Sequence, residues 1–183
     1  MVLCCPGRDM SAILKTTHKI ALAGLLSSLA VALGFLLMAI PNVELITLVV
    51  FVSGSILGVR GGALVGVVSM LIYSIANPMG TAIPLVTVSQ AAGQGIVGAL
   101  GATAPRLRRL STRRVVRNAL FAAAGVVVTL QYDLLTNLAL GASVGSVLPV
   151  VIAGLLFSLV HVMSNAMIFF FLVDVLLSVR DNG

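Results

Sequence analysis

Long apolar runs separated by short polar or glycine-rich breaks make up most of this chain. Because Gly, Pro and clustered charges interrupt helices, the breaks divide the chain into six apolar segments. These segments cover residues 20–40, 43–57, 61–76, 84–102, 118–140 and 147–177. About 20 apolar residues span a bilayer as a helix. The pattern therefore predicts an all-α membrane protein with six transmembrane helices in a compact bundle.

Composition agrees with the apolar pattern. Of the 183 residues, 60% are hydrophobic and 9% are charged, against roughly 45–50% and 25% in soluble domains. Disordered chains combine low hydrophobicity with high charge, which is the opposite balance. The composition therefore excludes both a soluble globular protein and a disordered one.

The distribution of charge predicts the orientation in the membrane. With six spans and a cytoplasmic N-terminus, all 11 Lys and Arg residues fall in cytoplasmic segments, as the positive-inside rule expects. We therefore expect a cytoplasmic tail at 1–19, a membrane domain at 20–178 with a basic cytoplasmic loop at 104–117, and a cytoplasmic tail at 179–183. Both termini are then cytoplasmic, and the net charge of +6 does not indicate a nucleic-acid partner.

Small residues recur four apart along the first apolar segment, most clearly as the pairs Ala23–Ser27 and Ala30–Gly34. Helices approach closely in lipid along such stripes. The stripe predicts either a contact with a neighbouring helix of the same chain or a docking face for another membrane protein. Similar rows of glycine occur at 62–66 and 93–101.

Polar residues inside the apolar segments occur as pairs one helical turn apart, which places both members on one face. In hydrocarbon such groups are costly and mark binding sites or pathways by default. With the orientation above, they converge on a cavity open to the outside. The candidate ligand-binding residues are Asn42, Glu44, Asn77, Gln90, Gln94, Gln131, Asp133, Asn137 and His161.

Structural roles remain open for several of these residues. Gln90 and Gln94 could join helices by hydrogen bonds, and His161 could be a neutral core histidine. Asp133 has no Lys or Arg in the predicted outer half, so its partner is expected to be Gln, Tyr, His161, water or a ligand. Asp174, near the cytoplasmic end of the last segment, is expected to face water or Arg180.

Motifs for catalysis are missing from the sequence. There is no Ser/His/Asp set in a supporting motif and no phosphate-binding loop ending in Lys-Ser/Thr. The two histidines are not accompanied by the neighbouring ligands that a metal site needs, and Cys4 and Cys5 alone make no disulfide framework. We therefore expect neither an enzyme nor a resident cofactor, and any ATPase must be a separate subunit.

These features resemble the substrate-binding S components of energy-coupling factor (ECF) transporters. The resemblance covers residues 15–178 and depends on the small-residue first helix, on Ile40-Pro41-Asn42-Val43-Glu44, on the glycines at 54–66 and on Asn77-Pro78-Met79-Gly80. It implies a subunit of the bacterial-type cytoplasmic (inner) membrane that binds a vitamin or related micronutrient. It also implies partners, namely a membrane scaffold subunit and two ATPase subunits.

The resemblance assigns roles to particular residues. Scaffold docking on the first helix maps to Ala23, Ser27, Ala30 and Gly34. Ligand contacts from the first loop and from helices four to six map to Asn42, Glu44, Gln90, Gln94, Gln131, Asp133, Asn137 and His161. The N-terminal Met-His element of nickel and cobalt members is missing here, which disfavours a metal substrate.

The candidate site favours a neutral or cationic ligand, because the predicted outer half offers no basic residue to an anion. Its amides would suit an amide-rich molecule such as a corrinoid or a corrinoid precursor. The alternative is a stand-alone secondary transporter or channel. That alternative is weakened by the lack of a three-plus-three repeat and by the apolar inner halves of the segments.

Overall fold

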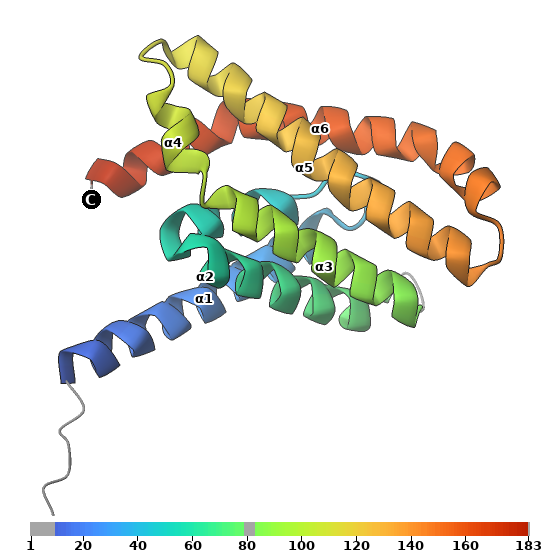
Figure 1. Ribbon diagram of the computed structural model, residues 1–183, viewed down its shortest axis with the longest axis horizontal. Helices are drawn as coiled ribbons and strands as arrows, with labels where there is room; N and C mark the ends of the chain where they lie inside the picture. The colour runs from blue at the N-terminus through green and yellow to red at the C-terminus, as the bar shows by residue number, and fades with distance from the viewer. Residues whose placement is uncertain (1–9, 79–82, 183) are drawn as a thin grey trace, which may run out of the picture.

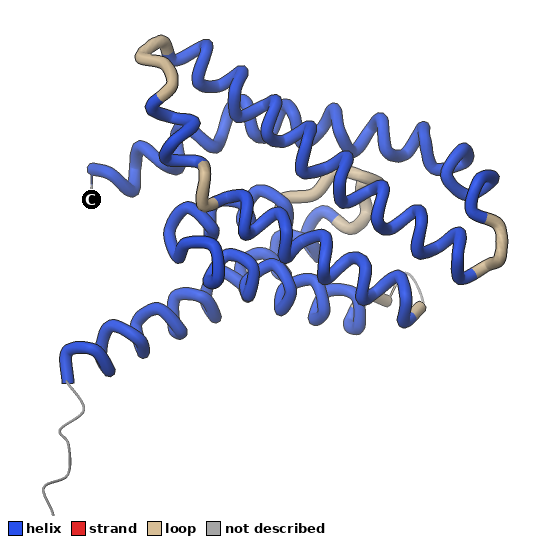
Figure 2. The backbone as a smooth tube through the Cα atoms, in the orientation of Figure 1, coloured by secondary structure: helices blue, strands red, loops and turns tan. Residues whose placement is uncertain are grey.

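A computed structural model describes residues 10–78 and 83–182 (Figure 1). Helices and the loops between them make up this part of the chain (Figure 2). The helices are α1 (Met10–Leu37), α2 (Ile46–Ala76), α3 (Pro84–Gly101), α4 (Ala104–Arg109), α5 (Arg114–Ser143) and α6 (Val147–Asn182). The expected all-α class is confirmed.

Five of the helical stretches are long and apolar enough to cross a membrane. They are 14–37, 46–76, 84–109, 114–143 and 147–179. The protein is thus a multi-pass membrane protein. The number differs from the six expected spans because the segments at 43–57 and 61–76 belong to one element, α2.

Gly58 breaks α2 in the middle. Its φ of 78° and ψ of −178° are not helical, and this conformation is open mainly to glycine. A Cβ added to Gly62 would lie only 2.4 Å from the Cα of Gly54, whereas eight residues of continuous helix extend about 12 Å. The chain therefore folds back at Gly58, and α2 consists of a first arm (46–57) and a second arm (59–76).

Glycines bring α2 and α3 into backbone contact. A Cβ on Gly98 would lie 2.0 Å from the carbonyl oxygen of Gly62, and one on Gly54 would lie 1.9 Å from that of Gly98. A Cβ on Gly66 would lie 2.1 Å from the carbonyl oxygen of Gln94. The glycine rows expected to pack closely thus do so, at the end of the bundle where α2 reverses.

The small-residue stripe of α1 faces the interior. Ser27, Ala30 and Gly34 are buried and Ala23 packs partly buried against the core. A Cβ on Gly34 would lie 2.5 Å from Ile46 Cδ1. This placement corresponds to the internal-contact alternative. The small residues on the exposed side of α1 are instead Gly24, Ser28 and Ala32.

Arginines of α4 and α5 bind a buried carboxylate on α6. Asp174 is 4% exposed, and its Oδ1 accepts hydrogen bonds from Arg108 Nε at 3.2 Å and Arg117 Nε at 3.0 Å. Its Oδ2 lies 2.9 Å from Arg117 Nη2. The expectation that Asp174 faces water or Arg180 is therefore wrong, because the basic segment folds back over α6.

Helical structure extends into both predicted tails. Helix α1 begins at Met10, within the predicted tail at 1–19, and α6 continues to Asn182. Cys4, Cys5, Met79 and Gly80 lie outside the described residues.

Candidate functional site

A cavity of about 590 Å³ opens at the end of the bundle opposite α4. The end of α1, the loop at 38–45, the second half of α5 and the first half of α6 line it, and Tyr73 and Gln90 close it from α2 and α3. Volumes of this size hold small organic ligands. The cavity therefore lies where α2, α3, α5 and α6, the four helices that carry the polar pairs, come together.

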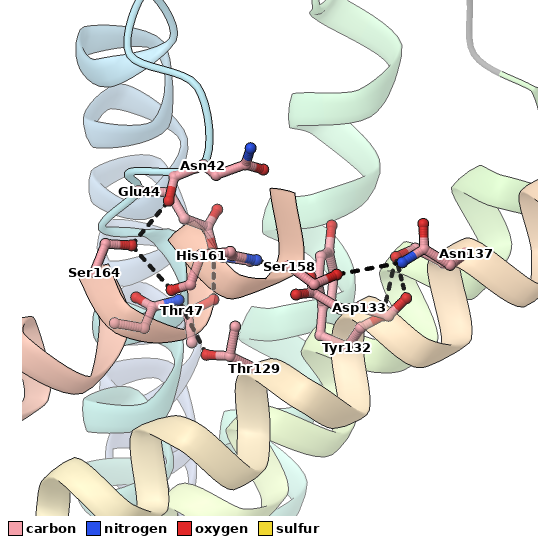
Figure 3. Close-up of polar contacts among 12 residues, drawn as sticks. Asn42, Glu44, Thr47, Thr129, Tyr132, Asp133, Asn137, Ser158, His161 and Ser164 are labelled. Carbon is pink, nitrogen blue, oxygen red and sulfur yellow. Dashed lines mark hydrogen bonds and ion pairs between the residues drawn. The ribbon is translucent and has the colours of Figure 1, made fainter. Parts of the chain in front are cut away.

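His161 lies between two carboxylates at this cavity. Its Nδ1 atom is 2.8 Å from Asp133 Oδ1, and its Nε2 atom is 3.4 Å from Glu44 Oε1 (Figure 3). His161 is 6% exposed and Asp133 is 9% exposed. The imidazole thereby connects α6 to α5 and to the loop at 38–45.

This polar contact continues into the interior of the bundle. The hydroxyl of Thr47 donates to Glu44 Oε1, and Gln94 Nε2 donates to Thr47 Oγ1 at 2.9 Å. Both Thr47 and Gln94 are almost fully buried. One chain of hydrogen bonds therefore runs from α3 through α2 and the loop to His161 and Asp133.

The loop at 38–45 is also held through its backbone. Ser164 Oγ donates to the carbonyl oxygen of Asn42 at 2.8 Å (Figure 3). Asn42 has a φ of 59°, a left-handed conformation that asparagine tolerates better than most residues. These contacts keep the side chains of Asn42 and Glu44 at the cavity.

Amide and aromatic side chains complete the walls. Gln90 Oε1 accepts a hydrogen bond from Ser74 Oγ at 3.0 Å, and Asn137 Nδ2 lies 3.4 Å from Ser158 Oγ. The Tyr132 ring meets the imidazole of His161 edge-on, with centroids 6.1 Å apart. The cavity thus offers amides, hydroxyls and ring faces beside its two carboxylates.

Most of the residues predicted for the site meet at this cavity. Those that line it are Asn42, Glu44, Gln90, Asp133, Asn137 and His161. The three that do not are Asn77, which caps the C-terminal end of α2, Gln94 and Gln131. Gln94 joins α3 to α2 by a hydrogen bond, which was the structural alternative for this glutamine. Gln131 lies near Gly93 of α3.

The lining residues that sequence reasoning missed include Thr136, Phe157 and Ser158. Ser158 precedes His161 by three residues, so helical spacing could have placed it on the same face. Thr136 follows Asp133 by three residues, but its hydroxyl donates to carbonyl oxygens of its own helix. Phe157 carries no polar signal.

The charged groups at the cavity are all acidic or imidazole. None of the described residues that line it is Lys or Arg. Glu44 and Asp133 bind different nitrogens of one ring and therefore lie on opposite sides of it, and no group of three ligating side chains among the described residues could hold a metal ion. The arrangement suits ligand binding by hydrogen bonds and charge.

We find no match to this chain among family models, curated proteins or solved structures.

Proposed function

We propose that this protein is the substrate-binding membrane subunit of an ATP-driven importer of the ECF type, specific for a vitamin or related micronutrient. The observation that carries the proposal is the polar cavity at one end of an otherwise apolar bundle. Glu44, Asp133 and His161 are held there by side-chain contacts from different elements, which is the preorganisation that tight binding requires.

The opposite end of the bundle supports a binding cup over a channel. There, the backbones of α2 and α3 touch at Gly54, Gly62 and Gly98, leaving no room for a methyl group. Apolar side chains such as Phe121 and Phe169 fill the adjoining core. A continuous polar path would have to cross this packing, so we infer that release of the ligand depends on a partner.

Orientation follows from the arginines of the segment 104–117. By the positive-inside rule this end faces the cytoplasm, and the cavity then opens outward. The first arm of α2 then runs inward and the second arm runs outward again, with the reversal at Gly58 between them, so that the chain has six membrane segments with both termini cytoplasmic. In this topology, the second and third membrane segments predicted from the sequence are the two arms of α2.

The cavity volume of about 590 Å³ is in the range that holds small organic ligands. Its amide side chains can bind a hydrogen-bonding micronutrient, of which a corrinoid or a corrinoid precursor is one example.

Partners are a membrane scaffold subunit and two ATPase subunits. Because Ala23, Ser27, Ala30 and Gly34 face inward, the scaffold would have to meet the opposite side of α1. That side carries Gly24, and a Cβ added there meets nothing within 4 Å.

A second candidate is a stand-alone, proton-coupled transporter. The observation that favours it is the imidazole between two carboxylates, because such groups exchange protons in secondary transporters. The two functions differ in their need for ATPases.

Uptake by cells tests the choice. The solute that copurifies with the protein is first identified by mass spectrometry of denatured material. Its uptake is then measured in cells that carry this protein with and without an energy-coupling module of scaffold and ATPases. We expect uptake only with the module. Full uptake without it supports the second candidate, and a protein that holds no solute contradicts both.

A further inference from the structure

We propose that the ligand of this cavity carries a single positive charge on a nitrogen group that donates hydrogen bonds, an ammonium or amidinium, and that this group binds Asp133. The inference rests on the proposed function and names the chemical class of its substrate. Its evidence is the balance of charge in the cavity, the unused atom of a buried carboxylate and the aromatic lining.

Charge in the cavity does not balance without a ligand. Glu44 and Asp133 contribute two carboxylates, and His161 contributes at most one positive charge. With both carboxylates ionised and the imidazole protonated, the cavity holds a net charge of −1, which one positive charge on a ligand would balance. Buried charge of one sign is strongly destabilising unless a partner compensates it.

No arginine can supply that compensation. The described residues that line the cavity include no Lys or Arg. Arg108 and Arg117 are committed to Asp174 at the other end of the bundle. Among the described residues, no side chain supplies the missing positive charge, so we infer that the ligand carries it.

One oxygen of Asp133 has no hydrogen-bond donor. Oδ1 is 2.8 Å from His161 Nδ1, whereas Oδ2 is buried and has no partner among the described residues. The residue is 9% exposed and belongs to the cavity wall. Buried acceptors are nearly always paired, so this oxygen points to a donor on the ligand. Ammonium and amidinium groups donate several hydrogen bonds and accept none.

Aromatic rings line the same space. Tyr73, Tyr132 and Phe157 belong to the cavity wall, and the faces of such rings attract cations within about 6 Å. Asn137 and Gln90 add amides that can bind the neutral remainder of the molecule. A cationic ligand with a flat or polar body can therefore contact the carboxylates, the aromatic rings and the amides of the cavity.

Matched probes of one size test the charge. We would measure binding of benzylamine and benzamidine, against benzyl alcohol and benzoate, to the purified full chain in detergent by saturation-transfer NMR and calorimetry. The proposal expects the two cations to bind about tenfold or more tightly than the alcohol, equivalent to about 1.4 kcal/mol. Benzoate should not bind.

Variants connect the preference to the carboxylates. Asp133→Asn should abolish the preference for the cations, whereas Asp133→Glu should keep it because the charge remains. Glu44→Gln serves as a second test if Asp133→Asn does not fold, and it should weaken the preference. Equal binding of amine and alcohol to the wild-type chain, a preference for the cations that survives in Asp133→Asn, or an unchanged preference in Glu44→Gln would overturn the proposal.

The copurified solute separates this proposal from the broader one. A neutral or anionic solute that fills the cavity would leave the proposed function standing and refute the assignment of charge. A chain that holds no solute and binds none of the four probes would refute both.

Discussion

The Nδ1 atom of His161 on α6 lies 2.8 Å from Oδ1 of Asp133 on α5, and this contact joins two walls of the cavity. The other ring nitrogen faces Glu44 in the loop at 38–45. One imidazole therefore holds three separate segments in the arrangement that forms the cavity.

Replacing His161 by Phe keeps a ring of similar size but removes both polar contacts. Two carboxylates then face a ring that gives them no hydrogen bond, and breaking a buried ion pair costs roughly 3–5 kcal/mol. We expect a lower unfolding temperature in detergent and loss of the copurified solute. His18→Phe is the control, because His18 is exposed on α1. Wild-type stability and solute content in His161→Phe would contradict a role for this contact.

Gly98→Ala tests the backbone packing of α2 on α3. The new methyl group would lie 2.0 Å from the carbonyl oxygen of Gly62, and backbone atoms cannot move aside cheaply. Overpacking of this kind costs about 1–3 kcal/mol or more, so we expect a lower unfolding temperature and less monodisperse protein. Gly24→Ala, with nothing within 4 Å of the added atom, should behave as wild type. Equal stability of the two variants would refute the packing.

Asp174→Asn tests the arginine cluster at the end opposite the cavity. Arg108 and Arg117 would lose a charged acceptor, and hydrogen bonds to charged groups contribute about 1.5–3 kcal/mol each. We expect a lower unfolding temperature while the solute is retained, because Asp174 lies far from the cavity residues along α6. Arg106→Gln, at an exposed position, is the control and should leave the unfolding temperature unchanged. Loss of solute without loss of stability would contradict the separation of the two ends.

Cysteine labelling in intact cells tests the fold-back of α2. In a chain with Cys4 and Cys5 replaced by Ala, single cysteines at Lys15, Ser111 and Val144 would be exposed to a membrane-impermeant thiol reagent. We expect labelling of Val144→Cys alone, because the reversal at Gly58 returns both termini to one side. If α2 crossed the membrane as one continuous span, Lys15→Cys would lie on the opposite side from Ser111→Cys. Labelling of Lys15→Cys would therefore contradict the reversal of α2 at Gly58.

Much of the site was predictable because its signals are local. Helical spacing placed Asp133 with Asn137, and the cost of an isolated carboxylate in hydrocarbon pointed to His161 as one of its partners. The breaks at Gly and Pro marked the ends of the apolar segments, including the reversal at Gly58. The spacing and the breaks depend on residues within a few turns of each other, and the pairing of Asp133 with His161 follows from the shortage of other partners.

The rest depends on contacts between distant segments. Gln90 and Gln94 have the same spacing signal, but only the packing of Thr47 against α3 shows that Gln94 is a joint between helices and not a wall of the cavity. Small residues cover two sides of α1, so the sequence could not decide which side packs on α2. Asp174 pairs with arginines 57 and 66 positions earlier in the chain, which no local pattern reveals.

The most direct test of the account is to fill the cavity and count the solute. Ala153 lines the cavity, whereas Ile152 is 57% exposed and is not among the lining residues. Mass spectrometry of denatured protein would give the amount of solute per chain for wild type, Ala153→Phe and Ile152→Phe. We predict about one molecule per chain in wild type and Ile152→Phe and almost none in Ala153→Phe. Equal solute content in the two variants, or none in the wild type, would contradict a binding function for this cavity.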